Sequence, residues 1–180
     1  MRIGLCGTHC SGKTTLSGEL AKALNHPLIN EVAASYTERD RKFIYIQLEI
    51  LQSQIERELS LNRFVSDRTV FDNFAYLQYH AKLNNFTDTI KDVQDIIDQY
   101  MKIHPYNYVV FIDEFFPLVD NGQRNMEADQ QRVIYDFLKD YAPAQCNKFK
   151  IPIIPITGDT PNRIQTIIDH IECYEHNKQK

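Results

Sequence analysis

The segment from Gly7 to Thr14 has the residue types and spacing needed to bind a phosphate group. It reads Gly-Thr-His-Cys-Ser-Gly-Lys-Thr and matches G-x-x-x-x-G-K-[ST] at every fixed position. In such a loop, successive backbone N–H groups face the phosphate at a helix N-terminus, whose dipole favours an anion. A strand-like run at residues 2–6 precedes the loop and a helical pattern at 13–25 follows it, which is the context that this motif requires. We therefore predict a nucleotide-binding phosphate loop.

The loop residues define the expected ATP site, with ATP and Mg²⁺ as cofactors. Lys13 can reach the β- and γ-phosphates, and the Thr14 hydroxyl is suited to coordinate Mg²⁺. A catalytic pair of His9 and Cys10 is the less favoured interpretation, because adjacent side chains point in different directions and no third group is evident. The expected ATP-binding residues of the loop are Gly7, Thr8, His9, Cys10, Ser11, Gly12, Lys13, Thr14 and Thr15.

Kinases, ATPases, GTPases and motors share this loop, so the ends of the other strands must separate them. In open α/β sheets, ligands bind beyond the carboxyl ends of the strands. Glu31 follows an expected strand at 28–30, and Asp67 and Arg68 follow one at 64–66. Asp67 could accept the proton of an attacking hydroxyl or help to hold Mg²⁺, and Arg68 could bind the acceptor or a phosphate. The alternative is that Asp67 is a helix N-cap and Arg68 is solvated.

A competing pair of carboxylates follows the expected strand at 108–112. Asp113 and Glu114 come directly after apolar residues, as in the Walker B pattern. Asp113 would then hold the Mg²⁺ shell and Glu114 would polarise a water molecule. The protein would in that case be a P-loop ATPase that needs no phosphoryl acceptor. Buried strands often end in an acidic residue, so this ATPase is the second functional class.

Residues 118–132 are expected to form a lid over the phosphate loop. Arg124 and Arg132 lie eight residues apart around a helix start. A mobile segment with two arginines would neutralise the transferred phosphoryl charge and exclude water. The alternative is a solvated helix face with paired charges. Arg163, which follows the last expected strand, is placed to stack on the adenine.

Short apolar runs alternate with longer helical patterns, which predicts a doubly wound α/β fold built from βαβ units. The expected strands are 2–6, 28–30, 64–66, 108–112 and 151–156, and the expected helices are 13–25, 39–61, 69–82, 87–102, 127–141 and 161–175. No linker or repeat marks a boundary, so 1–180 is expected to be a single domain. One buried apolar stripe is expected in the longest helix, formed by Ile44, Leu48, Leu51, Ile55 and Leu59.

The amino-acid composition limits the classes of partner that the protein is expected to bind. The 180 residues contain 20 Lys+Arg and 24 Asp+Glu, for a formal charge of −4. This balance disfavours a protein that coats nucleic acid, although it allows a local basic groove. No apolar run approaches the roughly 20 residues of a membrane helix. The four cysteines lack metal-ligand spacing, and we expect reduced thiols in the cytoplasm.

Several motifs in order resemble one family. They are the phosphate loop, Glu31-Val32-Ala33, Gln47 and Gln54 in the long helix, Val65-Ser66-Asp67-Arg68, Asp120-x-Gly122-x-Arg124 and Gly158-Asp159 with Arg163. The chain resembles AAA-like P-loop proteins related to the nicotinamide riboside kinase domain of bacterial NAD-biosynthesis regulators and, more distantly, nucleoside and nucleotide kinases. This resemblance implies a nucleotide-kinase-like P-loop NTPase fold, with a five-stranded parallel sheet flanked by helices.

The resemblance also implies phosphorylation of a hydroxyl on a nucleoside-like acceptor by Mg·ATP. By position, Lys13 and Thr14 would hold ATP and Mg²⁺, and Asp67 would be the base. Glu31, Arg68 and Gln47 would bind the substrate. Arg124 and Arg132 would belong to the lid, and Arg163 would approach the adenine.

The identity of the acceptor stays open among a nucleoside, a nucleotide, nicotinamide riboside and a polynucleotide. A basic cluster just beyond Glu31 could bind a nucleotide monophosphate or a polynucleotide, although a solvated helix start is the favoured interpretation. Its residues are Arg39, Arg41 and Lys42. Three aromatic residues could stack on a base: Tyr36, Phe71 and Tyr76. The leading hypothesis is a small-molecule kinase, and a DNA or RNA kinase is a further alternative.

Overall fold

The computed structural model describes residues 1–114 and 125–178, with side chains for all of these except 125–128 and 178. Its centre is a five-stranded sheet in the order β2-β3-β1-β4-β5. The strands are β1 (Arg2–Cys6), β2 (Leu28–Ile29), β3 (Phe64–Ser66), β4 (Tyr108–Ile112) and β5 (Ile153–Ile156). Every neighbouring pair is parallel. The expected five-stranded parallel sheet is therefore confirmed.

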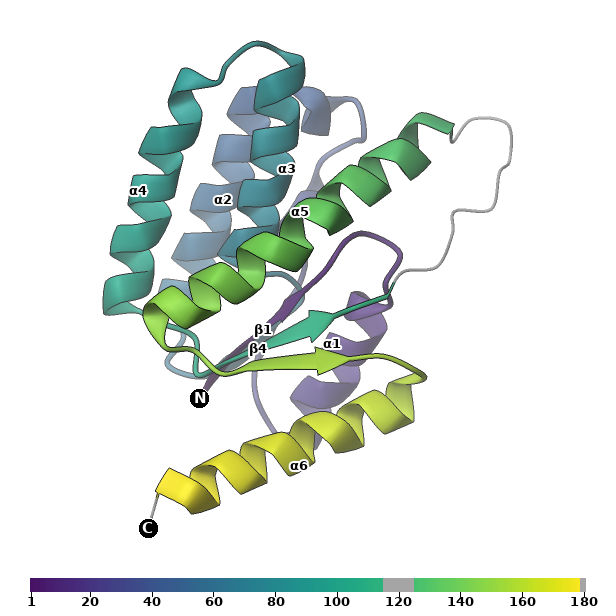
Figure 1. The fold of residues 1–180 in the computed structure, drawn as a ribbon, viewed down its shortest axis with the longest axis vertical. Helices are drawn as coiled ribbons and strands as arrows, with labels where there is room; N and C mark the ends of the chain where they lie inside the picture. The colour runs from purple at the N-terminus through teal and green to yellow at the C-terminus, as the bar shows by residue number, and fades with distance from the viewer. Residues whose placement is uncertain (115–124, 179–180) are drawn as a thin grey trace.

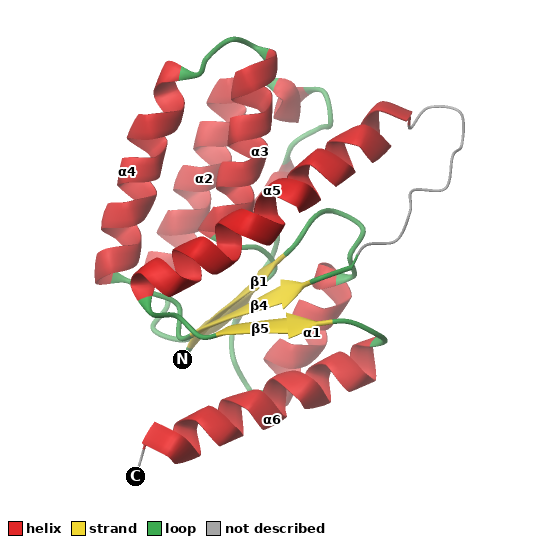
Figure 2. Ribbon diagram, viewed as in Figure 1, coloured by secondary structure: helices red, strands yellow, loops and turns green. Residues whose placement is uncertain are grey.

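Helices cover both faces of this sheet. Those of the described chain are α1 (Lys13–Ala23), α2 (Ile44–Leu59), α3 (Val70–Leu83), α4 (Asp88–Ile103), α5 (Asn125–Phe149) and α6 (Thr160–Lys178), with two short 3₁₀ turns, η1 (Val32–Ser35) and η2 (Asp40–Lys42). Helices α1 and α6 lie on one face, and α2 to α5 form a layer on the other (Figure 1). Figure 2 shows that loops join the strands to helices at both ends of the sheet. The doubly wound α/β architecture is confirmed.

Strand β4 is an unbroken run of buried apolar and aromatic residues because its two faces pack into two different cores. In β4, Tyr108, Val110 and Ile112 pack with α1 and α6, whereas Val109 and Phe111 pack into the core formed with α2 to α5. Side chains alternate between the two faces of a strand, so a strand covered on both faces is a continuous apolar run. Strand β5 lies at the sheet edge with Pro155 exposed, where a missing N–H group is tolerated.

Helix α5 is longer than the expected helix at 127–141. It extends to Phe149 and passes through Pro143. Its buried side chains continue at steps of four on both sides of this proline, at Ile134, Leu138, Ala142 and Cys146. Pro143 itself is exposed. Apolar burial on the inner face therefore outweighs the loss of one backbone hydrogen bond at Pro143.

The expected apolar stripe of α2 is wrong in part. Leu51 is buried, but Leu59 is 50% exposed. The buried face of the helix is instead formed largely by polar residues, since Gln47, Gln54 and Glu58 are buried beside Ile50 and Leu51. The expected helix at 39–61 is also interrupted at Phe43, whose extended backbone separates η2 from α2.

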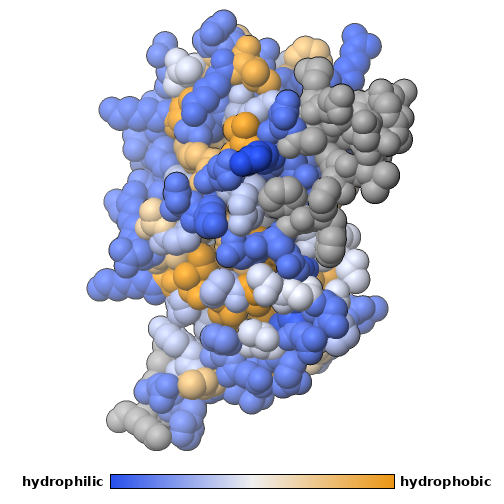
Figure 3. All heavy atoms as spheres, turned by 45° about the vertical axis from the view of Figure 1, so that its right-hand side comes forward, coloured by the Kyte–Doolittle hydropathy of each residue, from blue (hydrophilic) through white to orange (hydrophobic). Residues whose placement is uncertain are grey.

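Figure 3 shows a mainly hydrophilic face, with apolar side chains gathered in the band between α5 and α6 where β5 forms the sheet edge. Across the described ranges 1–114 and 125–178, none of the helices combines the length and apolar character needed to cross a bilayer. All four cysteines are free thiols.

Gly4 in β1 provides a test of this packing. A Cβ atom at Gly4 would lie 2.5 Å from Cγ2 of Thr69 and 3.3 Å from Cε1 of Tyr106, and both neighbours are buried. We expect Gly4→Ala to lower the free energy of unfolding by about 1–3 kcal/mol, measured by urea denaturation. The control is Gly18→Ala in α1, where a Cβ meets nothing within 4 Å. This change should raise stability by about 0.5–1 kcal/mol. Equal effects of the two substitutions would contradict the packing described here.

Candidate active site

The phosphate loop joins β1 to α1, as its sequence context predicted. Cys10 and Gly12 adopt left-handed backbone conformations, with φ angles of 57° and 84°. The Lys13 ammonium lies across the loop, because Nζ donates to the Thr8 carbonyl at 2.5 Å and to Ser11 Oγ at 3.2 Å. These turns curve the backbone around the position of Lys13, which is the shape expected of a phosphate cradle.

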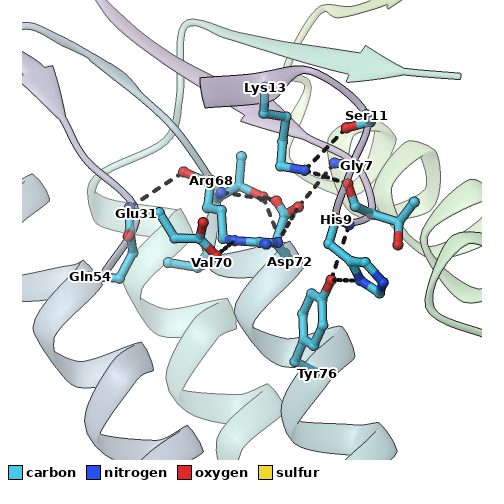
Figure 4. Close-up of polar contacts among 12 residues, drawn as sticks. Gly7, His9, Ser11, Lys13, Glu31, Gln54, Arg68, Val70, Asp72 and Tyr76 are labelled. Atoms are coloured by element: carbon cyan, nitrogen blue, oxygen red, sulfur yellow. Dashed lines mark hydrogen bonds and ion pairs between the residues drawn. The ribbon is translucent and has the colours of Figure 1, made fainter. Parts of the chain in front are cut away.

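Helix α3 holds the start of this loop (Figure 4). Asp72 Oδ1 accepts a hydrogen bond from the Gly7 amide at 2.9 Å, and the Tyr76 hydroxyl accepts one from the His9 amide at 3.2 Å. The His9 ring contacts the same hydroxyl through Nδ1 at 2.9 Å. Two residues one turn apart on α3 therefore fix two amides of the loop.

The N-cap of α3 is Thr69. Its hydroxyl and amide donate to Asp72 Oδ2 at 2.6 and 2.9 Å, and the Asp72 amide donates back to the Thr69 hydroxyl at 3.3 Å, which forms a capping box. The alternative interpretation of Asp67 as the N-cap is therefore wrong. The pattern Thr69-Val-Phe-Asp72 is the sequence signal that identifies the true cap.

Asp67 is buried directly after β3, beside the loop. Burial raises the pKa of Asp67 above its usual value, against the opposing effects of a hydrogen bond with Thr14 and the charge of Lys13. Its Oδ1 atom has no hydrogen-bond partner in the part of the chain that the structure describes. An unpartnered carboxylate oxygen beside the Thr14 hydroxyl is an oxygen donor set of the kind that Mg²⁺ prefers, so these residues fit the expected ion.

Arg68 and Glu31 form an ion pair across the carboxyl ends of β3 and β2. Arg68 Nε lies 2.6 Å from Glu31 Oε1, and Nη1 lies 3.7 Å from Asp72 Oδ1. The guanidinium also sits over the Tyr76 ring, 4.9 Å from its centroid. Burial alone would raise the pKa of Glu31, but the charge and hydrogen bond of Arg68 outweigh it and lower the pKa below its usual value. Glu31 is therefore ionised at neutral pH.

Two adjoining cavities meet at this ion pair. The loop cavity, of about 240 Å³, is lined by residues 9–15 together with Glu31 and Arg68. The larger cavity, of about 500 Å³, lies between the η turns, α2, α3 and the start of α5. Glu31 and Arg68, together with His9 and Cys10, line both cavities. A ligand held by the phosphate loop would therefore face a second ligand across Glu31 and Arg68.

The wall of the larger cavity combines aromatic, apolar and polar groups with charged residues of both signs. Tyr76, Tyr79 and Ile50 supply the apolar part, and Gln47 and His80 contribute polar atoms. Burial lowers the pKa of His80 to about 4, with a further contribution from the Lys42 charge, so this ring is neutral at pH 7.

The structure also places Gln47 and two of the candidate stacking residues relative to this cavity. Gln47 lines it, although its amide donates to the Arg41 carbonyl at 2.5 Å. Of the three candidate stacking residues, Tyr76 lines the larger cavity, but Phe71 is fully buried in the core. A stacking role for Phe71 is thus excluded by its burial.

Arg163 supports the loop rather than presenting an open stacking face. It is 2% exposed, and its Nη1 donates to the Ser11 carbonyl at 2.8 Å. Its Nη2 pairs with Glu114, which also accepts from the Gly158 amide at 2.9 Å. Arg163 is therefore not placed to stack on adenine as expected, because the guanidinium is enclosed between α6, Glu114 and the loop.

The other expected residues lie apart from the two cavities or outside the described residues. Asp113 accepts a hydrogen bond from the Tyr135 hydroxyl at 2.6 Å. The Arg132 side chain is 79% exposed and lies 3.9 Å from Asp136. Among the described residues, Asp113, Glu114 and Arg132 line neither cavity. Arg124, with most of the expected lid, lies outside the described residues.

Gln131 makes the contact with the phosphate loop that was expected of the lid arginines. It is 2% exposed, its side-chain amide donates to the His9 carbonyl at 2.8 Å, and its own carbonyl accepts from the Thr8 hydroxyl at 3.2 Å. Its neighbour Gln130 lines the larger cavity. The start of α5 therefore contacts both the loop and the larger cavity. Neither glutamine has a sequence signal, because the pattern shows only a polar helix start.

A phosphate loop on a parallel sheet of order 2-3-1-4-5, with a cavity on each side of one ion pair, defines a P-loop nucleotide-binding protein with a kinase-like fold. The chain matches the family model described as AAA domain over residues 2–163 and belongs to this family. The family expected from the sequence is therefore confirmed. A search of curated proteins finds no match.

Several solved structures share this fold at low sequence identity. Deoxyadenosine kinase from M. mycoides with bound dCTP superposes with a TM-score of 0.65 at 17% identity, over 96% of this chain and 100% of the kinase. NadR in complex with NR gives a TM-score of 0.65 at 18% identity, over 93% of this chain and 50% of NadR, so this chain spans half of that protein. Shikimate kinase from Aquifex aeolicus gives 0.54 at 18% identity, over 96% of each chain.

The charge of Lys13 gives a prediction about pH. Burial and the nearby Arg68 charge together lower the pKa of Lys13 to about 8, against the opposing effect of nearby carboxylates. The ammonium is therefore charged below pH 8 and loses its charge above it. We expect the affinity for a non-hydrolysable ATP analogue with Mg²⁺, measured by calorimetry, to fall roughly tenfold between pH 7 and pH 9. Lys13→Arg keeps its charge over this range and should show a flat profile. Parallel profiles would contradict the assignment.

Proposed function

We propose that this protein is a kinase that transfers the γ-phosphoryl group of ATP to a hydroxyl of a nucleoside-like small molecule. The observation that carries the proposal is the pair of adjoining cavities, one formed by the phosphate loop, that share Glu31 and Arg68. Phosphoryl transfer depends on holding donor and acceptor in line within a charge-stabilising site. Its support includes solved neighbours described as a deoxyadenosine kinase with bound dCTP and as NadR in complex with NR.

The loop would hold the phosphates of ATP. The Lys13 ammonium would bind the β- and γ-phosphates, and the loop amides would donate to the phosphate oxygens. Thr14 and Asp67 would hold Mg²⁺, which when bound neutralises charge on the phosphates. Asp67 suits this role because its Oδ1 atom is buried without a hydrogen-bond partner in the described chain. Arg163 would keep the loop in place through its hydrogen bond to the Ser11 carbonyl.

Glu31 is the better candidate for the proton acceptor. It lines both cavities and is ionised, whereas Asp67 lines neither of them in the described chain. A hydroxyl in the larger cavity would donate to the Glu31 carboxylate as it attacks the phosphorus. Arg68 holds this carboxylate through Nε, and its Nη1 is buried with no hydrogen-bond partner among residues 1–114 and 125–178. That nitrogen can donate to the transferred phosphoryl group.

A nucleoside-like acceptor matches the wall of the larger cavity. The volume of about 500 Å³ is in the range of small-molecule sites. Tyr76 and Tyr79 offer ring faces, and Asn73 Nδ2 is a buried donor without a partner in the described chain. Because His80 is neutral at pH 7, this part of the wall suits an uncharged polar ring. Residues 118–132 remain the proposed lid and 1–180 the proposed single domain.

The two alternatives have less support. An ATPase would need Asp113 or Glu114, but Asp113 is engaged by Tyr135, and Glu114 by Arg163 and Gly158. A polynucleotide kinase is favoured only by Arg41 and Lys42 at the larger cavity, where a longer acceptor could enter. The same cavity also contains Glu31 and Glu38, which reduce its positive charge.

Two carboxylate variants separate the proposed roles. Glu31→Gln should lower kcat for phosphoryl transfer by about 10²–10⁴-fold with little change in ATP affinity, because a proton acceptor is lost. Asp67→Asn should chiefly raise the Mg²⁺ concentration needed for half-maximal transfer. Asp113→Asn is the control and should leave transfer unchanged. Abolition of transfer by Asp67→Asn at saturating Mg²⁺, with Glu31→Gln active, would return the role of base to Asp67.

The function itself is tested by transfer of labelled γ-phosphate to a panel of nucleosides, nucleotides, nicotinamide riboside and oligonucleotides. We expect labelling of a nucleoside-like compound, and its loss in Lys13→Ala while the thermal unfolding midpoint stays close to that of the wild type. Brisk phosphate release without any acceptor would instead support the ATPase. Labelling confined to oligonucleotides, and weakened by salt, would support the polynucleotide kinase.

A further inference from the structure

A fully buried carboxylate lies behind the proposed site, on the unexpectedly polar face of α2. Glu58 is 0% exposed. Its Oε1 atom accepts hydrogen bonds from the Tyr106 hydroxyl and the Gln54 amide, both at 2.7 Å. Its Oε2 atom accepts one from the Tyr100 hydroxyl at 2.6 Å, and Arg2 Nη2 lies 3.6 Å away. The carboxylate is therefore the centre of a buried polar cluster formed by Glu58, Gln54, Tyr100, Tyr106 and Arg2.

This cluster reaches the turn that carries Asp67 and Arg68. Gln54 Nε2 donates to Ser66 Oγ at 2.8 Å. It also makes a longer contact with the Arg68 carbonyl at 3.4 Å (Figure 4). The Tyr106 hydroxyl accepts a hydrogen bond from the Val70 amide at 3.0 Å. The turn is thus held on both sides, at the end of β3 and at the first residue of α3, by two residues that converge on one oxygen of Glu58.

Stability alone explains this arrangement poorly. A carboxylate removed from water loses its hydration, and well-packed apolar residues commonly fill such a space without loss of stability. Burial also raises the pKa of Glu58 above its usual value, which reports the unfavourable environment of its charge. The polar cluster instead fixes the orientation of side chains. Because the carboxylate is held by three hydrogen bonds, Gln54 and Tyr106 have a single arrangement against the turn.

We propose that Glu58, acting through Gln54 and Tyr106, is a positioning residue that fixes the turn from Ser66 to Val70, and thereby holds Arg68 at the two cavities and Asp67 beside the phosphate loop. Loss of this support would shift Arg68 relative to Glu31, and small displacements of a charge-stabilising group cost a large factor in rate. The kinetic part of this inference rests on the proposed kinase function. The structural part concerns the turn alone.

Two tyrosine variants form a matched pair for the test. Tyr106→Phe and Tyr100→Phe each remove one hydroxyl that donates to Glu58. Each hydroxyl also accepts one further hydrogen bond, but the Tyr106 hydroxyl accepts it from Val70 in the turn, and the Tyr100 hydroxyl accepts it from Arg2. Tyr106→Phe therefore removes one of the two links between the carboxylate and the turn and leaves the link through Gln54, whereas Tyr100→Phe removes neither. A general loss of stability should affect both variants alike.

The first measurement is amide hydrogen exchange at Asp67, whose N–H donates to the Ile29 carbonyl and does not contact Tyr106 in the described structure. We expect exchange at this amide to accelerate about tenfold in Tyr106→Phe and to stay within about twofold of wild type in Tyr100→Phe. The second measurement is steady-state transfer. Tyr106→Phe should lower kcat at least about tenfold with KM for both substrates nearly unchanged, and Tyr100→Phe should keep kcat within about twofold.

Each outcome decides the proposal. Selective acceleration at Asp67 with a selective loss of kcat supports it. Parallel changes in the two variants would overturn it, because the cluster would then act only through stability, and so would unchanged exchange and kcat in Tyr106→Phe. If wild-type protein phosphorylates none of the acceptors, the proposed function fails, and hydrogen exchange alone then decides whether the cluster positions the turn.

Discussion

The ion pair between Arg68 and Glu31 is the contact on which the candidate site depends. It joins the carboxyl ends of two neighbouring strands, β3 and β2, and forms the boundary between the loop cavity and the larger cavity. A partly buried ion pair loses hydration, so contacts with neighbouring groups matter to its stability. The Asp72 carboxylate lies 3.7 Å from Arg68 Nη1 and the Tyr76 ring lies against the guanidinium, so α3 contacts the pair as well as the sheet.

Helix α3 connects this ion pair to the phosphate loop. Asp72 caps the helix through one carboxylate oxygen and holds the Gly7 amide with the other, and Tyr76 holds the His9 amide. Behind the helix start, the buried cluster around Glu58 supports the turn that leads into it. The loop, the ion pair and the turn are therefore parts of one connected set of polar contacts.

The features that depend on local sequence patterns could be predicted from the sequence alone. The five strands and the phosphate loop follow from apolar runs and from a motif with fixed spacing, and the structure confirms both. The burial of Gln54 and Glu58 did not follow, because helical periodicity counts apolar residues and a polar residue becomes a core residue only when its partners are known. The position of Arg163 depends on Ser11, which is 152 residues away in the chain. Contacts of this kind exist only in the folded molecule.

The same distinction separates the two carboxylates of the site. Asp67 and Glu31 both directly follow expected strands, and only the folded structure shows that Glu31 lines both cavities whereas Asp67, in the described chain, lines neither. The kinase proposal therefore depends less on the phosphate loop, which many proteins share, than on the position of the ion pair between two spaces. Donor and acceptor would then be bound side by side.

The most direct measurement is the affinity of dinucleoside pentaphosphates, in which adenosine is joined through five phosphates to a second nucleoside, compared by calorimetry with that of ATP. Because the loop cavity and the larger cavity adjoin, one such compound should occupy both and bind about a hundredfold more tightly than ATP. Glu31 and Arg68 would lie beside the linking phosphates. If every such compound binds no more tightly than ATP itself, the two cavities do not form one donor–acceptor site, and the account is wrong.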